Sequence, residues 1–178
     1  MAIEWVIYTI IATAIWAVLN IVDSYLMNTV VKNTLTVTVL WGVFQTIAII
    51  PLFFLLKPIL PSTEILFILI LGGIFYLGCL WFYFKALQQD DTSNIIALWN
   101  LGSIMIPIFA FFLLNERLGI NQYIAIALIV FSSAAISIKD AKNLFKPSTA
   151  LVLMIFASLI ISFAYITEKY AIDSGASV

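Results

Sequence analysis

Histidine is absent from this 178-residue sequence, cysteine occurs once, and charged residues make up only 10% of the chain, against roughly 25% in soluble domains. Without histidine there is no imidazole for the metal sites and serine-type triads that depend on it. Cys79 has no second cysteine for a disulfide or a thiolate metal site, and we interpret it as a small packing residue. The net charge of −1 provides no basic field, which excludes a nucleic-acid partner.

Catalytic motifs are missing as well. No glycine-rich segment resembles a phosphate-binding loop, and no pair of carboxylates has the pattern of a hydrolase site. We therefore expect a protein that is not an enzyme and that holds no metal and no cofactor.

Apolar residues dominate instead, at 64% of the chain, and the mean hydropathy is +1.16. Each apolar run is near the ~20 residues that a helix needs to cross ~30 Å of hydrocarbon. The first run is longer than the ~7–15 residues of a signal-peptide core and follows no basic segment, so we expect a retained span. Strands are excluded because open sheet edges leave backbone groups unpaired in lipid. The sequence predicts an all-α, polytopic membrane helix bundle with spans at 5–27, 34–56, 65–87, 93–114, 122–138 and 150–168.

Polar residues recur along five of these six runs at helical spacing, so that each run has one polar face. Such faces lie against other helices or line a water-filled cavity. The sets are Thr9, Thr13, Trp16, Asn20 and Asp23; Thr34, Thr38, Trp41 and Gln45; Gly72, Tyr76, Cys79 and Tyr83; Ser93, Asn100, Ser103 and Pro107; and Ser158, Ser162, Tyr165 and Lys169.

Two interpretations of these faces are open. Polar side chains also join membrane helices to one another, at about 0.6 kcal/mol for an average hydrogen bond. The amides of Gln45 and Asn100 are harder to satisfy near mid-depth, because each has two donors and an acceptor, so we expect both to face one shared cavity. Three tryptophans are more often packing residues or interfacial anchors than ligand contacts: Trp16, Trp41 and Trp99. Trp16 and Trp41 are stronger candidates for ligand contact, because they share the polar faces. The substrate-cavity candidates are Trp16, Asn20, Gln45, Tyr83, Asn100 and Ser103.

Three further residues have candidate roles near or within the spans. Asp23 and Lys85 lie within about a turn of a span end, where a charged group either reaches the interface or forms an ion pair. Asp23 is the carboxylate that we link to proton coupling, and Lys85 is expected to reach an acidic group or the cavity mouth. Pro107 removes a backbone hydrogen bond, which predicts a kink in the fourth helix.

An ordered set of short motifs lies between residues 76 and 138: Tyr83 with Lys85-Ala86-Leu87, then Ser93, Pro107, Glu116-Arg117-Leu118, Gln122 and Leu128-Ile129. This set resembles the EamA-like family of the drug/metabolite transporter superfamily. The first two runs fit the same order with Trp16-Ala17 and Asn20. The fifth run departs from the family, because it reads Ile124-Ala125-Ile126-Ala127 where a glycine is frequent.

The resemblance implies ten helices in two inverted five-helix repeats, with substrate bound between the repeats near the midplane. Residues 1–138 are then the first repeat, 139–148 a loop, and 149–178 the start of the second repeat in a chain that ends early. The segments "IWAVLNIVDSY" and "SFAYITEKY" share an aromatic-alanine step followed by polar residues, as two first helices of repeats would. The resemblance also implies a cytoplasmic N-terminus, although the distribution of Lys and Arg favours an external one.

The expected function is secondary transport of a small metabolite, such as an amino acid or a related compound, into or out of the cell. A multi-pass protein of the cell membrane would do this by alternating access, with a proton as a candidate coupling ion. A homodimer is an alternative source of the second repeat. Two other functions stay open at this point: a membrane scaffold or assembly partner that transports nothing, and a lipid flippase.

Overall fold

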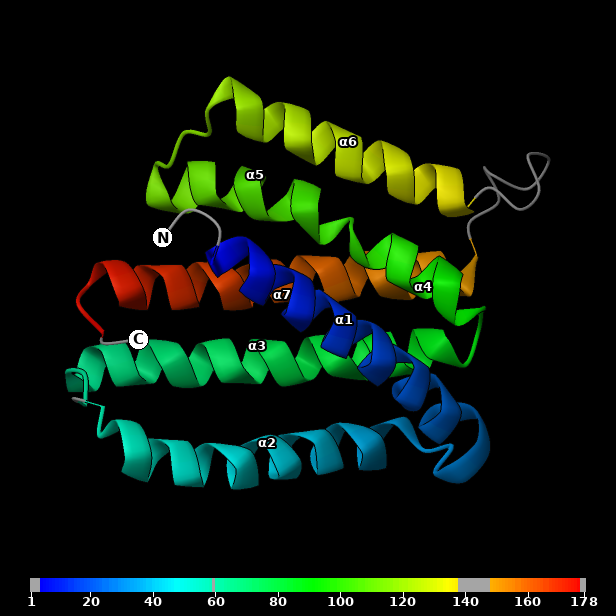
Figure 1. Ribbon diagram of the computed structural model, residues 1–178, viewed down its shortest axis with the longest axis horizontal. Helices are drawn as coiled ribbons and strands as arrows, with labels where there is room; N and C mark the ends of the chain where they lie inside the picture. The colour runs from blue at the N-terminus through cyan, green and yellow to red at the C-terminus, as the bar shows by residue number, and fades with distance from the viewer. Residues whose placement is uncertain (1–3, 59, 138–147, 177–178) are drawn as a thin grey trace.

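The computed structural model describes residues 4–58, 60–137 and 148–176, and every regular element in these ranges is helical (Figure 1). This confirms the predicted all-α membrane helix bundle. The elements are α1 (Glu4–Tyr25), a π-helical turn η1 (Leu26–Val30), α2 (Thr34–Leu56), α3 (Thr63–Leu87), α4 (Thr92–Trp99), α5 (Gly102–Leu114), α6 (Ile120–Ser137) and α7 (Thr149–Asp173).

Five helical stretches within the described ranges are long and apolar enough to cross a bilayer: Val6–Val30, Thr34–Leu56, Thr63–Leu87, Thr92–Leu114 and Thr149–Asp173. The fifth predicted run is the helix α6, which has 18 residues. The last residue predicted for it, Ile138, and the expected loop up to residue 147 lie outside the described residues.

Short polar residues begin and end several of these helices. Asn33 caps α2, where its Oδ1 accepts a hydrogen bond of 3.1 Å from the backbone N–H of Thr36. Ser148 caps α7 in the same way, with 3.0 Å from its Oγ to the N of Leu151. Asn115 follows α5 with a φ of 56°, a left-handed conformation that asparagine tolerates well. These short polar residues therefore mark the helix boundaries.

The helices α3 and α7 lie side by side at the centre of the bundle (Figure 1). α2 packs on the far side of α3, α5 packs along α7, α6 is outermost against α4 and α5, and α1 crosses obliquely over this group. In its most apolar stretch α7 is 50% buried, whereas α2 is 0% buried. The helix that was expected to start a second repeat thus lies in the core, among the residues of the preceding helices.

Small residues and stacked rings allow α3 and α7 to approach closely. Gly72 on α3 has no side chain where Thr167 of α7 lies, and a Cβ at Gly72 would overlap the Thr167 hydroxyl. That hydroxyl donates a 2.7 Å hydrogen bond to the carbonyl of Ala164 in its own helix. Phe82 stacks on Phe156 with ring centroids 5.7 Å apart. Such small-residue contacts are the usual basis of helix association in lipid.

The buried polar residues of α7 serve packing. Ser158 and Ser162 are 2% and 0% exposed, and the Ser162 hydroxyl donates a hydrogen bond of 2.6 Å to the backbone carbonyl of Ser158. Further along the helix, Lys169 lies 3.3 Å from Asp173 in an exposed ion pair. Ser162 and Lys169 are therefore paired within α7, whereas the buried Ser158 hydroxyl has no hydrogen-bond partner among the described residues.

The fourth span differs from the continuous helix that the sequence predicted, because it is broken between α4 and α5 at Asn100 and Leu101. At the junction the backbone bonds tighten to i→i−3, with Asn100 N to Ala97 O at 3.2 Å and Leu101 N to Leu98 O at 3.0 Å. Pro107, where a kink was expected, lies inside α5. Asparagine and glycine are poor helix formers, which explains why the helix is interrupted at Asn100-Leu101-Gly102.

A methyl group at Gly72 tests the central contact. We expect Gly72→Ala to lower the free energy of unfolding by about 1–3 kcal/mol, because the added Cβ overlaps the Thr167 hydroxyl and forces α3 and α7 apart. Gly73→Ala is the matched control, since a Cβ there meets no heavy atom within 4 Å. Reversible unfolding in detergent with increasing SDS measures both variants. Equal stability of the two would contradict the packing described here.

Candidate functional site

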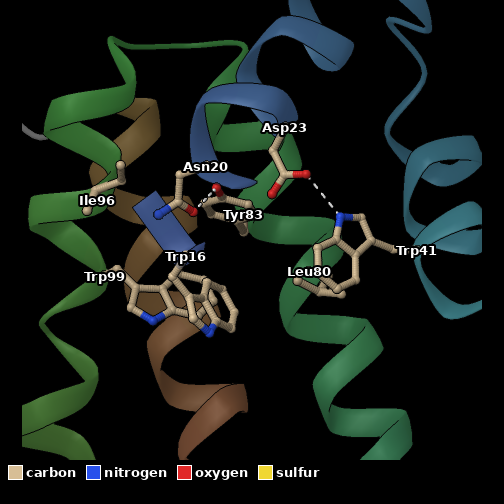
Figure 2. A pocket seen from close by; sticks show the side chains of 8 residues that line it. All are labelled: Trp16, Asn20, Asp23, Trp41, Leu80, Tyr83, Ile96 and Trp99. Carbon is tan, nitrogen blue, oxygen red and sulfur yellow. Dashed lines mark hydrogen bonds between the residues drawn. The ribbon is translucent and has the colours of Figure 1, made fainter. Parts of the chain in front are cut away.

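The oblique path of α1 brings one face of that helix toward α3 and α4. Its spacing of three and four residues aligns Trp16, Asn20 and Asp23 on that face. Together with side chains from α2, α3 and α4 they surround a cavity of about 50 Å³, which we call the aromatic chamber (Figure 2). Its lining residues are Trp16, Asn20, Asp23, Trp41, Leu80, Tyr83, Ile96 and Trp99.

Tyr83 joins α3 to α1 in the wall of the chamber. Its hydroxyl donates a 2.9 Å hydrogen bond to Oδ1 of Asn20, and the tyrosine side chain is only 4% exposed. The indole of Trp99 packs edge-on to the tyrosine ring, with 5.1 Å between the centroids. The tyrosine is thus held at both its hydroxyl and its ring, which fixes its orientation in the wall.

Asp23 supplies the one charged group of the chamber. It is 5% exposed, and its Oδ1 accepts a 3.0 Å hydrogen bond from Nε1 of Trp41 on α2 (Figure 2). A buried carboxylate is costly unless it is hydrogen-bonded or paired with a cation. Trp41 meets part of this need, Tyr83 also interacts with the carboxylate, and the lining of the chamber contains no Lys or Arg.

A second group of hydrogen bonds holds the end of α1 against the connection between α3 and α4. The Thr92 hydroxyl donates a hydrogen bond of 2.6 Å to the Ser24 hydroxyl. Nδ2 of Asn28 donates one of 3.3 Å to the carbonyl of Leu87. Nε2 of Gln88 donates a hydrogen bond of 2.9 Å to the carbonyl of Lys32. These side chains were not singled out from the sequence, although Ser24 and Asn28 continue the polar residues of the first run past Asp23.

The structure brings four of the predicted residues into one site: Trp16, Asn20, Asp23 and Tyr83. Trp41 and Trp99 were weighed from the sequence as packing residues, interfacial anchors or ligand contacts, and both line the chamber. Leu80 and Ile96 were missed, because a leucine and an isoleucine in apolar runs carry no signal of their own.

Neither of the two cavities described here has both Gln45 and Asn100 in its lining, although the sequence predicted one shared cavity. Gln45 lines a separate space of about 550 Å³ between α2, α3 and α7, together with Tyr76, Tyr165 and Glu168. Asn100 is at the junction of α4 and α5, and neither it nor the nearby Ser103 is in the lining of the chamber or of this second cavity. The described cavities thus give the two amides no common site.

Lys85 lies outside the chamber. Its side chain is exposed, and Nζ lies 4.7 Å from the centroid of the Trp81 ring, one helical turn earlier on α3. This cation–π contact places the ammonium beside Trp81, which lines an open groove between α2 and α3, and no ion pair of the described residues joins Lys85 to an acidic group.

The fold and the chamber define a polytopic membrane protein with a mostly apolar pocket between its spans, which is walled by aromatic rings and holds a few polar groups, an arrangement typical of small-molecule transporters. The model of the EamA-like transporter family matches residues 3–138. The chain therefore belongs to the EamA-like transporter family, within the drug/metabolite transporter superfamily, as its motifs indicated. No curated protein and no solved structure matches the chain.

The hydrogen bond between Asn20 and Tyr83 is suited to a double-mutant cycle. We expect Asn20→Ala and Tyr83→Phe to be non-additive by about 0.6 kcal/mol or more, the average for interhelical hydrogen bonds in a membrane. SDS unfolding in detergent gives the four stabilities. Tyr8→Phe, which changes a tyrosine that is 71% exposed on α1, is the control and should show no coupling with Asn20→Ala. Additive effects of the Asn20 and Tyr83 changes would mean that the bond contributes nothing to the fold.

Proposed function

We propose that this member of the family is a secondary transporter that carries a small metabolite across the cell membrane, with the aromatic chamber as the substrate site. The observation that supports this is the convergence of α1, α2, α3 and α4 on one pocket that contains an amide, a hydroxyl and a carboxylate among aromatic rings. Pockets of this composition, mostly apolar with a few placed polar groups, are characteristic of small-molecule binding.

The substrate would be an amino acid or a related compound of small size. The Asn20 amide and the Tyr83 hydroxyl would hold its polar groups, and the indoles of Trp16 and Trp99 would cover its apolar part. Asp23 is our candidate for coupling to protons, because it is the one ionisable carboxylate in the lining.

The chamber as it stands is too small for a whole metabolite, since 50 Å³ holds only a few water molecules at roughly 10–15 Å³ each. Substrate entry then requires a movement of one wall. α1 is suited to this because only 6% of its apolar stretch is buried, so it is held largely by the polar contacts of the chamber and of its own C-terminal end. Alternating access would displace α1 and the corresponding helix of an inverted repeat in turn.

Lipid flipping is the second candidate function, and a groove between α2 and α3 favours it. This groove of about 670 Å³ is open at the surface and is lined mainly by apolar side chains, among them Val39, Leu77 and Trp81. Acyl chains fit such a lining. The groove shares no residue with the aromatic chamber, so the two functions would use different surfaces.

Cysteine labelling in the bilayer tests whether the chamber admits water and solutes. In a Cys79→Ala background, Asn20→Cys should react with a small, membrane-impermeant thiol reagent roughly tenfold faster than Ile21→Cys, because the thiolate that reacts forms only in a hydrated environment. Ile21 is the matched control, as the next residue of α1 with 67% exposure on the face toward lipid.

Competition and lipid transfer complete that experiment. A transported amino acid should slow the reaction of Asn20→Cys, and reconstituted protein should show uptake of that amino acid without scrambling of labelled phospholipid. Equal, slow reaction at both positions would overturn the proposal and return Asn20 to helix packing. Scrambling without uptake would favour the flippase.

A further inference from the structure

We propose that the groove between α2 and α3 binds one anionic phospholipid, with an acyl chain along the groove and the headgroup phosphate at Lys85. The groove is lined by residues of these two helices, among them Leu35, Val39, Leu77 and Trp81. None of its lining residues lines the aromatic chamber, so this site goes beyond the proposed function and does not depend on it. The lipid is a bound ligand here and not a transported one.

The lining of the groove suits a hydrocarbon chain. Two threonines supply its side-chain hydroxyls, and both hydroxyls are already used. Thr38 donates a hydrogen bond of 2.9 Å to the carbonyl of Thr34. Thr46 donates one of 2.8 Å to the carbonyl of Gly42. Hydroxyls that are bonded within their own helix present mainly their methyl groups to a ligand, so the groove accepts an apolar chain and offers a polar headgroup no place along its length.

The length of the groove matches one leaflet of a bilayer. Along α2 the lining runs from Leu35 to Ile47, a distance of about 18 Å at ~1.5 Å per residue. Half of the ~30 Å hydrocarbon thickness is about 15 Å. The groove therefore extends from the start of α2 to near the middle of the membrane, as the acyl chain of a single lipid does.

Positive charge gathers at the end of the groove where α2 begins and α3 ends. Lys85 is exposed, and its Nζ lies 4.7 Å from the centroid of the Trp81 ring in the lining. Lys32 is also exposed, and its carbonyl accepts a hydrogen bond of 2.9 Å from Nε2 of Gln88, about one turn beyond Lys85. Neither ammonium forms an ion pair with another described residue. Two unpaired cations beside an apolar groove complement the phosphate and the chain of an anionic lipid.

The carboxylate of Asp90 does not neutralise these lysines. Asp90 lies in the connection between α3 and α4, which Figure 1 shows leading away from α2. Its Oδ1 accepts hydrogen bonds of 3.0 Å from Nδ2 of Asn94 and 2.7 Å from the backbone N–H of Asp91. These bonds hold the carboxylate on the α4 side of the connection, and the end of the groove stays positive.

Brominated lipids measure occupancy of the groove, because bromine on an acyl chain quenches only an indole that it contacts. Vesicles of phosphatidylcholine contain either brominated phosphatidylglycerol or brominated phosphatidylcholine, and the signal of Trp81 is the difference between the chain and its Trp81→Phe variant. We expect phosphatidylglycerol to bind at Trp81 at least about fivefold more tightly than phosphatidylcholine, the preference that one lysine near the surface confers. Equal binding of the two lipids would overturn the inference.

Two matched pairs of variants locate the site. Lys85→Gln should lower the preference for phosphatidylglycerol roughly fivefold, whereas Lys57→Gln, the same change of charge at the other end of α2, should leave it unchanged. Val39→Phe should abolish much of the quenching of Trp81, because the larger ring fills the groove. Val18→Phe, at a position of α1 that is 60% exposed, should not. A full preference in Lys85→Gln would contradict the proposal.

Three further outcomes would each identify a different role for the groove and overturn the proposal. If neither lipid quenches Trp81 until the protein is diluted in the vesicles, a second copy of this chain covers the groove. If soluble glycerol 3-phosphate abolishes the preference, Lys85 binds free phosphate and not a lipid. If the reconstituted chain moves labelled phosphatidylglycerol between leaflets and Lys85→Gln does not, the lipid is transported and not held.

Discussion

The close contact between α3 and α7 is the constraint on which the rest of the structure depends. Gly72 allows the two helices to approach, and α2 and α5 pack on the two members of this pair. α3 also carries Leu80 and Tyr83 into the chamber. In lipid, where burial of apolar surface gives no net gain over contact with acyl chains, such close packing is the main force that positions helices.

α1 is held mainly by polar side-chain contacts, and several of these contacts involve residues of the candidate substrate site. Its face toward the bundle is joined by Asn20 to Tyr83, by Asp23 to Trp41 and by Ser24 to Thr92. The first two of these bonds involve the same polar atoms that would meet a substrate. Binding in the chamber would therefore exchange contacts that hold α1 for contacts with the ligand, which is the kind of differential interaction that shifts a conformational equilibrium.

The family match and the packing describe different parts of the chain. The match covers residues 3–138 and so includes the elements from α1 to α6, while α7 begins at Thr149. α7 nevertheless has the most buried apolar stretch of the five spans and lies against α3, α4 and α5. Its buried serines and small residues match neighbours that precede it in the sequence, which is why it completes the core instead of standing apart.

The sequence by itself determined the class of the protein, the five long spans and the faces that carry Trp16, Asn20, Asp23 and Tyr83, because hydropathy and helical phase are local properties. Only the tertiary structure decided which faces meet. It placed Gln45 in a cavity whose lining does not include Asn100, broke the fourth span before Pro107, placed Lys85 over Trp81, and set α7 in the core. The physical reason is that these outcomes depend on the angle and depth at which distant helices pack, and no single helix encodes them.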